Sequence, residues 1–193
     1  MRKILLISIT AVLFIGVMAM PSFAMSSLAD DFLLACRALD SEFPPPKWSK
    51  TDVRAAALEV LNAVDAGKFK DDWPLDFCIR ALGYTEYNQD IDRILSYEQR
   101  MTYPVLIALK GFQHQKVVDL FMKYLSDTKS PKRECAVKGL AAVDFKKFDN
   151  PAELRNKVLA ALNNARQKEK RNWLKDDMDL AISIVEGYAI PTK

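Results

Sequence analysis

The chain has 193 residues, half of them hydrophobic, with a formal net charge of +3 and a single histidine. This length suits one domain with a sizeable apolar core. A charge so close to neutral gives no bulk electrostatic basis for binding nucleic acid or an anionic membrane. One histidine also excludes a metal site built from several histidines.

The first 24 residues have the layout of a secretory signal peptide. Arg2 and Lys3 precede an uncharged run over residues 4–20, and small residues at 22 and 24 mark a cleavage site. The alternative is an uncleaved membrane anchor, but the run lies at the lower limit for crossing a bilayer. The sequence therefore predicts an exported protein, periplasmic or secreted. Residues 25–193 form its single mature domain, with no stable membrane anchor after cleavage.

Three cysteines remain in the mature chain, at Cys36, Cys78 and Cys135. Export places them in an oxidising compartment, where one disulfide can form. We expect Cys36 and Cys78 to pair, because Cys135 lies in a different part of the repeat pattern described below. The alternative is that all three are small buried apolar residues.

Apolar residues recur at helical spacing through nearly all of the mature chain. These stripes predict helices over residues 26–43, 49–67, 73–84, 88–99, 100–112, 114–127, 130–145, 150–165 and 171–188. The segments 88–99 and 100–112 fit either two short helices or one helix kinked at Pro104. Alternating strand patterns and hairpin turn dipeptides are absent from the sequence. The fold class is therefore all-α, with short connections and antiparallel neighbours.

Several residues mark the expected helix ends. Three prolines at 44–46 end the first helix, and Gly67 and Gly83 follow as end signals for the second and third. Ser130 is placed to cap the helix that follows it, with Pro131 in the first turn.

Two segments of the chain resemble each other. Residues 51–69 align without a gap over residues 130–148, with eight identical positions that include Arg54 over Arg133. The offset of 79 residues is close to two units of about 40 residues, the length of two-helix repeats. The alternative is an irregular helical bundle with two similar amphipathic helices.

The stretch "LFMKYLSDTKSPKRECAVKGL" is similar to a HEAT-type unit. A first helix ends in Leu-x-Asp, a short turn contains proline, and arginine, alanine and leucine follow on the second helix. The resemblance is best over residues 117–143. It implies a short α-solenoid of HEAT-like antiparallel helix pairs, in which Asp127, Arg133 and Arg54 tie neighbouring units together.

No catalytic, cofactor or metal constellation is found in the sequence. His114 has no serine or cysteine paired with it, and the cysteines lack metal-ligand spacing. Phosphate loops, dinucleotide fingerprints and nucleophile elbows are also absent. We therefore expect no catalytic residues, no cofactor and no metal.

A basic run over residues 165–175 is the one candidate binding segment. Arg171, Trp173 and Lys175 are candidates to contact an acidic partner, with the tryptophan as an anchor. The alternative is a solvated loop followed by the first turn of a helix.

The resemblance and the absent motifs together favour a non-catalytic scaffold that binds a protein or peptide on the surface made by the second helices. The alternative is a helical-bundle enzyme or small-molecule carrier, with a pocket lined by Tyr97, Glu98, Tyr103 and His114. A third option is a structural component that self-associates through its tryptophan-bearing ends. The oligomeric state is not predicted.

Overall fold

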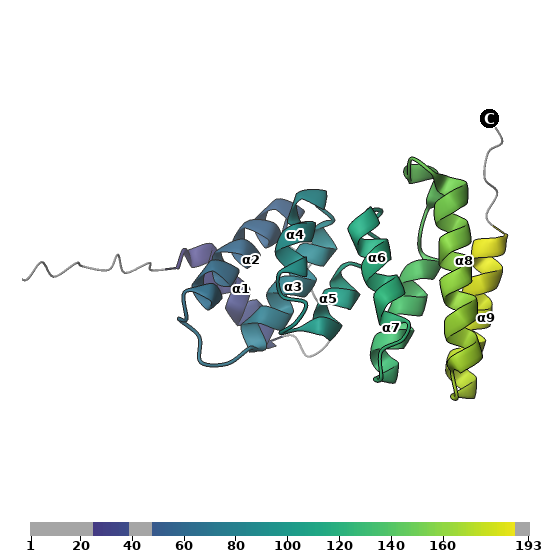
Figure 1. Cartoon of the computed structure of the whole chain (residues 1–193). Helices are drawn as coiled ribbons and strands as arrows, with labels where there is room; N and C mark the ends of the chain where they lie inside the picture. The colour runs from purple at the N-terminus through teal and green to yellow at the C-terminus, as the bar shows by residue number, and fades with distance from the viewer. Residues whose placement is uncertain (1–24, 39–47, 188–193) are drawn as a thin grey trace, which may run out of the picture.

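The computed structural model describes residues 25–38 and 48–187, and all regular structure in these ranges is helical (Figure 1). The all-α prediction is thus confirmed. The expected signal peptide and the prolines at 44–46 lie outside the described residues. Within those residues, no helix is long and apolar enough to cross a membrane.

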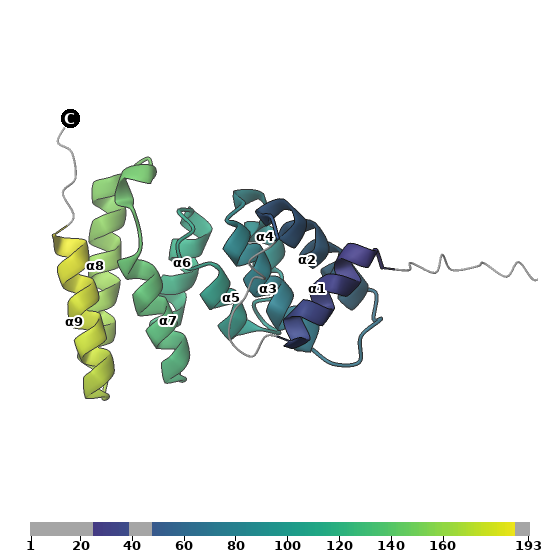
Figure 2. The same cartoon turned by 180° about the vertical axis from the view of Figure 1, so that it is seen from behind.

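The helices follow one another along the molecule in chain order, with α1 at one end and α8 and α9 at the other (Figures 1 and 2). Their bounds are α1 Ser27–Ala38, α2 Lys50–Asp65, α3 Trp73–Thr85, α4 Ile91–Leu95, α5 Thr102–Ala108, α6 Gln115–Tyr124, α7 Ser130–Ala141, α8 Pro151–Lys168 and α9 Asn172–Glu186. Short 3-10 helices lie at Asn88–Asp90 and Phe145–Lys147.

Local sequence signals explain several of these boundaries. The Ser49 hydroxyl accepts a hydrogen bond from the Asp52 N–H and caps α2, and Gly67 follows that helix with φ +72°. His114 Nδ1 accepts from the Lys116 N–H at 3.2 Å and caps α6. Pro104 lies in the first turn of α5, where a missing N–H is tolerated, so residues 88–112 form two short helices.

Two residues predicted to mark helix ends have other roles in the structure. Gly83 lies inside α3, which ends at Thr85 and is capped by Glu86 in the left-handed conformation with φ 61°. A Cβ on Gly83 would stand 2.5 Å from the Ala108 carbonyl oxygen, so this glycine allows α3 and α5 to approach closely. Ser130 is the first residue of α7 and not its cap, because the capping position belongs to Lys129.

The helices form two rows. In one row, α3 contacts α5, α5 contacts α7 and α7 contacts α9. In the other, Arg93 of α4 reaches Asp65 of α2, Lys116 of α6 reaches Asp92 of α4, and α6 contacts α8. Neighbours in the chain, such as α2 with α3 or α8 with α9, pack across the rows. One continuous apolar core lies between them.

The two aligned segments share a contact but not a position. Arg54 of α2 pairs with Asp90, and Arg133 of α7 pairs with Glu169, each carboxylate lying 36 residues after its arginine. In both cases the acidic residue lies just before the next helix of the same row. However, α2 and α7 belong to different rows, so an offset of two whole helix pairs does not describe their relation.

Candidate binding site

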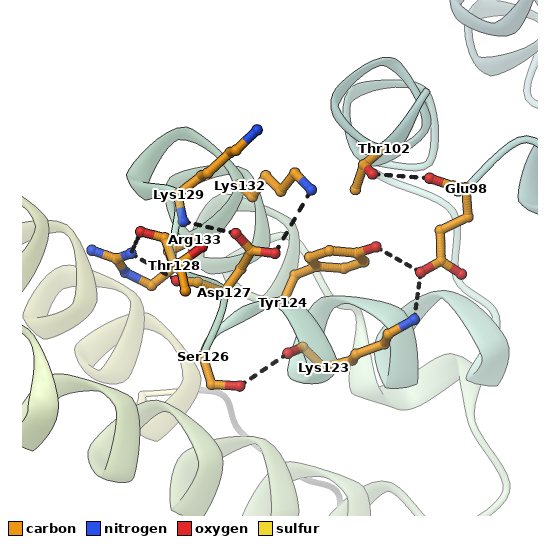
Figure 3. A network of polar contacts seen from close by, with 10 residues as sticks. All are labelled: Glu98, Thr102, Lys123, Tyr124, Ser126, Asp127, Thr128, Lys129, Lys132 and Arg133. Atoms are coloured by element: carbon orange, nitrogen blue, oxygen red, sulfur yellow. Dashed lines mark hydrogen bonds and ion pairs between the residues drawn. The ribbon is translucent and has the colours of Figure 1, made fainter. Parts of the chain in front are cut away.

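Arg133 joins the turn between α6 and α7 to the turn between α8 and α9. Its Nε donates to Glu169 Oε2 at 2.7 Å, in the turn between α8 and α9. Its Nη1 donates to the carbonyl oxygens of Asp127 and Thr128 at 2.8 and 3.1 Å, in the turn between α6 and α7 (Figure 3). One planar guanidinium thus fixes the spacing of both turns.

The Glu169 carboxylate is fully used by internal contacts. Its other oxygen accepts from the backbone N–H groups of Lys170 and Arg171 at 2.8 and 2.9 Å. Burial alone would raise the pKa of Glu169, but the hydrogen bonds from Arg171, Arg133 and Lys170 lower it below its usual value. The carboxylate therefore stays charged and orders the chain that enters α9.

Two other carboxylates near these turns, those of Asp127 and Glu98, also form hydrogen bonds and ion pairs within the chain. Asp127 Oδ1 accepts from the Lys129 N–H at 2.7 Å, and Lys132 lies 3.7 Å from Oδ2 (Figure 3). Glu98 accepts from the Tyr124 hydroxyl at 2.7 Å and from Lys123. Neither carboxylate is left to balance further positive charge.

Two adjoining hollows open beside these turns, and together we call them the basic groove. The first has a volume of about 380 Å³, and the apolar part of its lining, which we call the floor, includes Met122, Leu125, Ala161 and Ala165. The second, of about 720 Å³, is lined by Tyr103, the start of α7 and Arg171. The two hollows share Thr128 and Arg171, so they form one continuous surface.

The rim of the basic groove carries uncompensated positive charge. Lys129, Lys168, Lys170 and Arg171 are exposed, and none of these side chains forms an ion pair within residues 25–38 and 48–187. Lys129 and Arg171 also occupy the capping positions of α7 and α9, whose first turns contain no acidic residue. Cations at the positive end of a helix repel its dipole, so these positions favour a nearby anion.

The predicted partner-binding residues are only partly brought together. Arg171 lines both hollows, and Trp173 follows it in the first turn of α9 with 47% of its surface exposed. Lys175 lines neither hollow and is half-buried near Asp179. Lys129, Lys168 and Lys170 were not singled out individually, although the basic run over residues 165–175 contains two of them.

The exposed apolar side chains are unevenly distributed over the two rows. Among residues 25–38 and 48–187, eight large hydrophobic residues are exposed, and the row of α3, α5, α7 and α9 carries six of them: Tyr84, Tyr103, Ile107, Trp173, Leu180 and Ile184. The described helices α2, α4, α6 and α8 carry none of the eight. We call the surface over the first row the apolar face. On α7 the apolar face is interrupted, because this helix carries none of the eight and forms the partly exposed Glu134–Lys138 ion pair.

The residues proposed for an alternative pocket do not converge. The Tyr97 hydroxyl donates to Asp65 at 2.9 Å, Glu98 is held by Lys123 and Tyr124, and His114 caps α6. Of these four residues, Tyr103 lines the second hollow of the basic groove. Among the described residues, no group of three or more histidine, cysteine or carboxylate side chains is placed to hold a metal.

The three cysteines are free thiols in the structure, and Cys36 and Cys78 are buried. Burial raises the pKa of Cys36 to about 12 and that of Cys78 well above its usual value. The disulfide between them stays a prediction.

Comparison of the chain with family models, curated proteins and solved structures finds no match in any of the three.

Proposed function

We propose that this protein is an exported, non-catalytic binding protein whose antiparallel helix pairs form a short HEAT-like α-solenoid, and whose partner is a protein or peptide bound on the apolar face. The observation that carries this proposal is the concentration of exposed large hydrophobic residues on one row of helices. Single exposed hydrophobics are ordinary on soluble proteins, whereas a gathering on one face is typical of an interaction surface.

The composition of the apolar face supports protein recognition. Tyrosine and tryptophan supply large rigid contact areas with a polar edge, and both are enriched at interfaces. Trp173, Leu180 and Ile184 lie at positions i, i+7 and i+11 of α9, which places them on one side of that helix. These three side chains therefore share one side of α9, on which Asp176 and Asp177 lie between Trp173 and Leu180.

The proposal can be tested by site-specific photocrosslinking in cells. A photoreactive residue at Ile107 should crosslink to one reproducible partner, and the same group at exposed Asn163 of α8 should not. The double variant Leu180→Ser/Ile184→Ser should lose the adduct. Leu34→Ser is the matched control, since Leu34 is 62% exposed but lies on α1 outside the face. Equal crosslinking from Ile107 and Asn163 would contradict the proposal.

Export is part of the same proposal and rests on the charged, apolar and small-residue layout of residues 1–24. The mass of the protein isolated from cells should correspond to a chain that starts at Met25. A protein that retains its first 24 residues would contradict cleavage at this position.

A small-molecule carrier is the second candidate, and the first hollow supports it. Its volume of about 380 Å³ falls in the range of ligand pockets, and Met122, Leu125 and Ala165 are among the residues that line it. Denaturing the purified protein should release a bound small molecule if this candidate is correct.

A further inference from the structure

We propose that the basic groove binds an acidic peptide segment of the partner, with carboxylates on its rim and an aliphatic side chain on its floor. This inference rests on the proposed function and specifies the chemistry of the bound segment.

The basic groove has more basic than acidic side chains. Its lining contains six basic side chains, those of Lys129, Lys132, Arg133, Lys168, Lys170 and Arg171. It contains two acidic side chains, those of Asp127 and Glu169. The Glu169 carboxylate accepts hydrogen bonds from Arg133 and from two backbone N–H groups. The Asp127 carboxylate accepts from the Lys129 N–H and pairs with Lys132. The remaining cations have no internal counter-charge in the described chain, whereas the whole chain is nearly neutral. The positive charge is therefore concentrated at this site.

Hydrogen bonds within the chain hold the walls of the groove in place. Arg133 connects the two turns that form its walls, and Glu169 fixes the backbone of Lys170 and Arg171. Cations on a fixed backbone can meet carboxylates at defined positions, which favours a specific segment over a diffuse counterion cloud.

The floor of the groove selects for more than charge. Met122, Leu125, Ala161 and Ala165 present apolar surface in the first hollow, directly beside the basic rim. A nucleic acid backbone would place phosphates on the rim but leave this floor without an apolar partner. A segment that alternates glutamate with leucine satisfies both surfaces at once.

The groove also adjoins the apolar face. Tyr103 of α5 lines the second hollow, and 46% of its surface is exposed. Trp173 of the apolar face lies two residues after Arg171 of the groove. A segment bound in the groove can therefore continue onto the face, where Tyr103 and Trp173 offer aromatic contacts.

The test uses fluorescein-labelled synthetic peptides and the mature full-length protein, with binding read by fluorescence anisotropy. The probe is the peptide Glu-Glu-Leu-Glu-Glu-Leu, and its comparison has serine in place of leucine. We expect the leucine peptide to bind several-fold more tightly, and oligothymidylate of equal charge to bind more weakly than either. Equal affinity for oligothymidylate and the leucine peptide would overturn the inference, because the groove would then be a general anion site.

The variant Lys168→Glu/Lys170→Glu reverses two rim charges but keeps the backbone N–H groups that Glu169 binds. We expect it to lose about tenfold or more in affinity for the leucine peptide, since like charges would now face each other. Lys70→Glu/Lys157→Glu is the matched control, with the same charge change at two exposed lysines outside the groove. Circular dichroism should show the same helical content for both variants. Unchanged peptide affinity in the groove variant would overturn the inference.

Photocrosslinking from Ile107 separates this inference from the proposed function. A groove variant that loses both the peptide and the cellular adduct supports both proposals. A groove variant that keeps the cellular adduct overturns the inference and leaves the apolar face as the binding surface.

Discussion

At the scale of single residues, the pair of Arg133 and Glu169 has the lowest side-chain exposure of the ion pairs in the described chain, 11% and 3%. A buried ion pair adds little stability by itself, because two charges must leave water to form it. Removing one partner is different, since the remaining charge stays buried without compensation. Arg133 also satisfies two carbonyl groups of the turn before α7.

We expect Arg133→Ala to lower the free energy of unfolding by about 3 kcal/mol, the usual result of breaking a buried pair. Arg54→Ala should have a smaller effect, because 27% of the Arg54 side chain is exposed to water. Urea denaturation followed by circular dichroism measures both. Arg166→Ala is the control, since its pair with Asp179 lies on the surface, and its effect should be the smallest of the three.

The lowered pKa of Glu169 predicts a dependence of stability on pH. Its pKa in the folded chain lies below the unfolded value, so its contribution is fully present above about pH 4.3, the usual glutamate pKa. The contribution is lost as the pH falls through the lower, folded pKa. We expect wild-type protein to lose more stability than Glu169→Gln between about pH 5 and pH 3. Equal losses would show that Glu169 does not titrate differently on folding.

At the scale of helices, close approach depends on glycine at two buried positions. A Cβ on Gly83 would meet the backbone of Ala108 at 2.5 Å, and one on Gly139 would meet the ring of Phe121 at 2.5 Å. Alanine raises helix propensity at both sites by about 1 kcal/mol, so any loss of stability must come from the clash.

We expect Gly83→Ala to destabilise the protein by about 1–3 kcal/mol, because backbone atoms of α5 can yield only if the whole helix moves. Gly139→Ala should be milder, since the Phe121 ring can turn or shift within the core. Thermal unfolding of the two variants and the wild type compares them directly. A smaller loss for Gly83→Ala than for Gly139→Ala would contradict this account of the contact between α3 and α5.

The same two glycines show what the sequence can and cannot predict. Helical periodicity identifies every described helix, because each helix must bury one face whatever its neighbours are. Gly83 looks like an end signal, yet its role is set by α5, which lies some 25 residues further along the chain. Similarly, Ser130 follows the local rule for a cap, but Asp127 and Arg133 satisfy the turn before α7 instead.

The sequence predicts the basic part of the candidate site but not the distant residues that position it. A run of basic residues makes 165–175 stand out, and Arg171 does line the groove. The partners of that run cannot be found from local sequence, because Glu169 meets Arg133 across 36 residues. The earlier pair of Arg54 and Asp90 repeats this separation, and that repetition is the one signal that sequence alone offers for Glu169.

At the scale of the whole molecule, contacts run between near neighbours in each row, and the two ends lie apart (Figures 1 and 2). The helices α5 and α7 each have neighbours on both sides within their row, and α3 contacts α2, α4 and α5. By contrast, α9 contacts α7 and α8, and its opposite side carries the exposed Leu180 and Ile184. In the α-solenoid that we propose, stability is a sum over adjacent units, so the ends can open while the centre stays folded.

We therefore expect amide hydrogen exchange to be slowest in α3, α5 and α7 and faster in α1 and α9. The control is Leu174→Ala, which removes a fully buried side chain from α9. It should accelerate exchange in α9 and α8 well before it affects α3, because α9 packs on α7 and α8 and is joined to α3 in its row through α7 and α5. If Leu174→Ala accelerated exchange equally in every helix, the molecule would unfold as one cooperative unit, and the description as adjacent, separately opening helix pairs would be wrong.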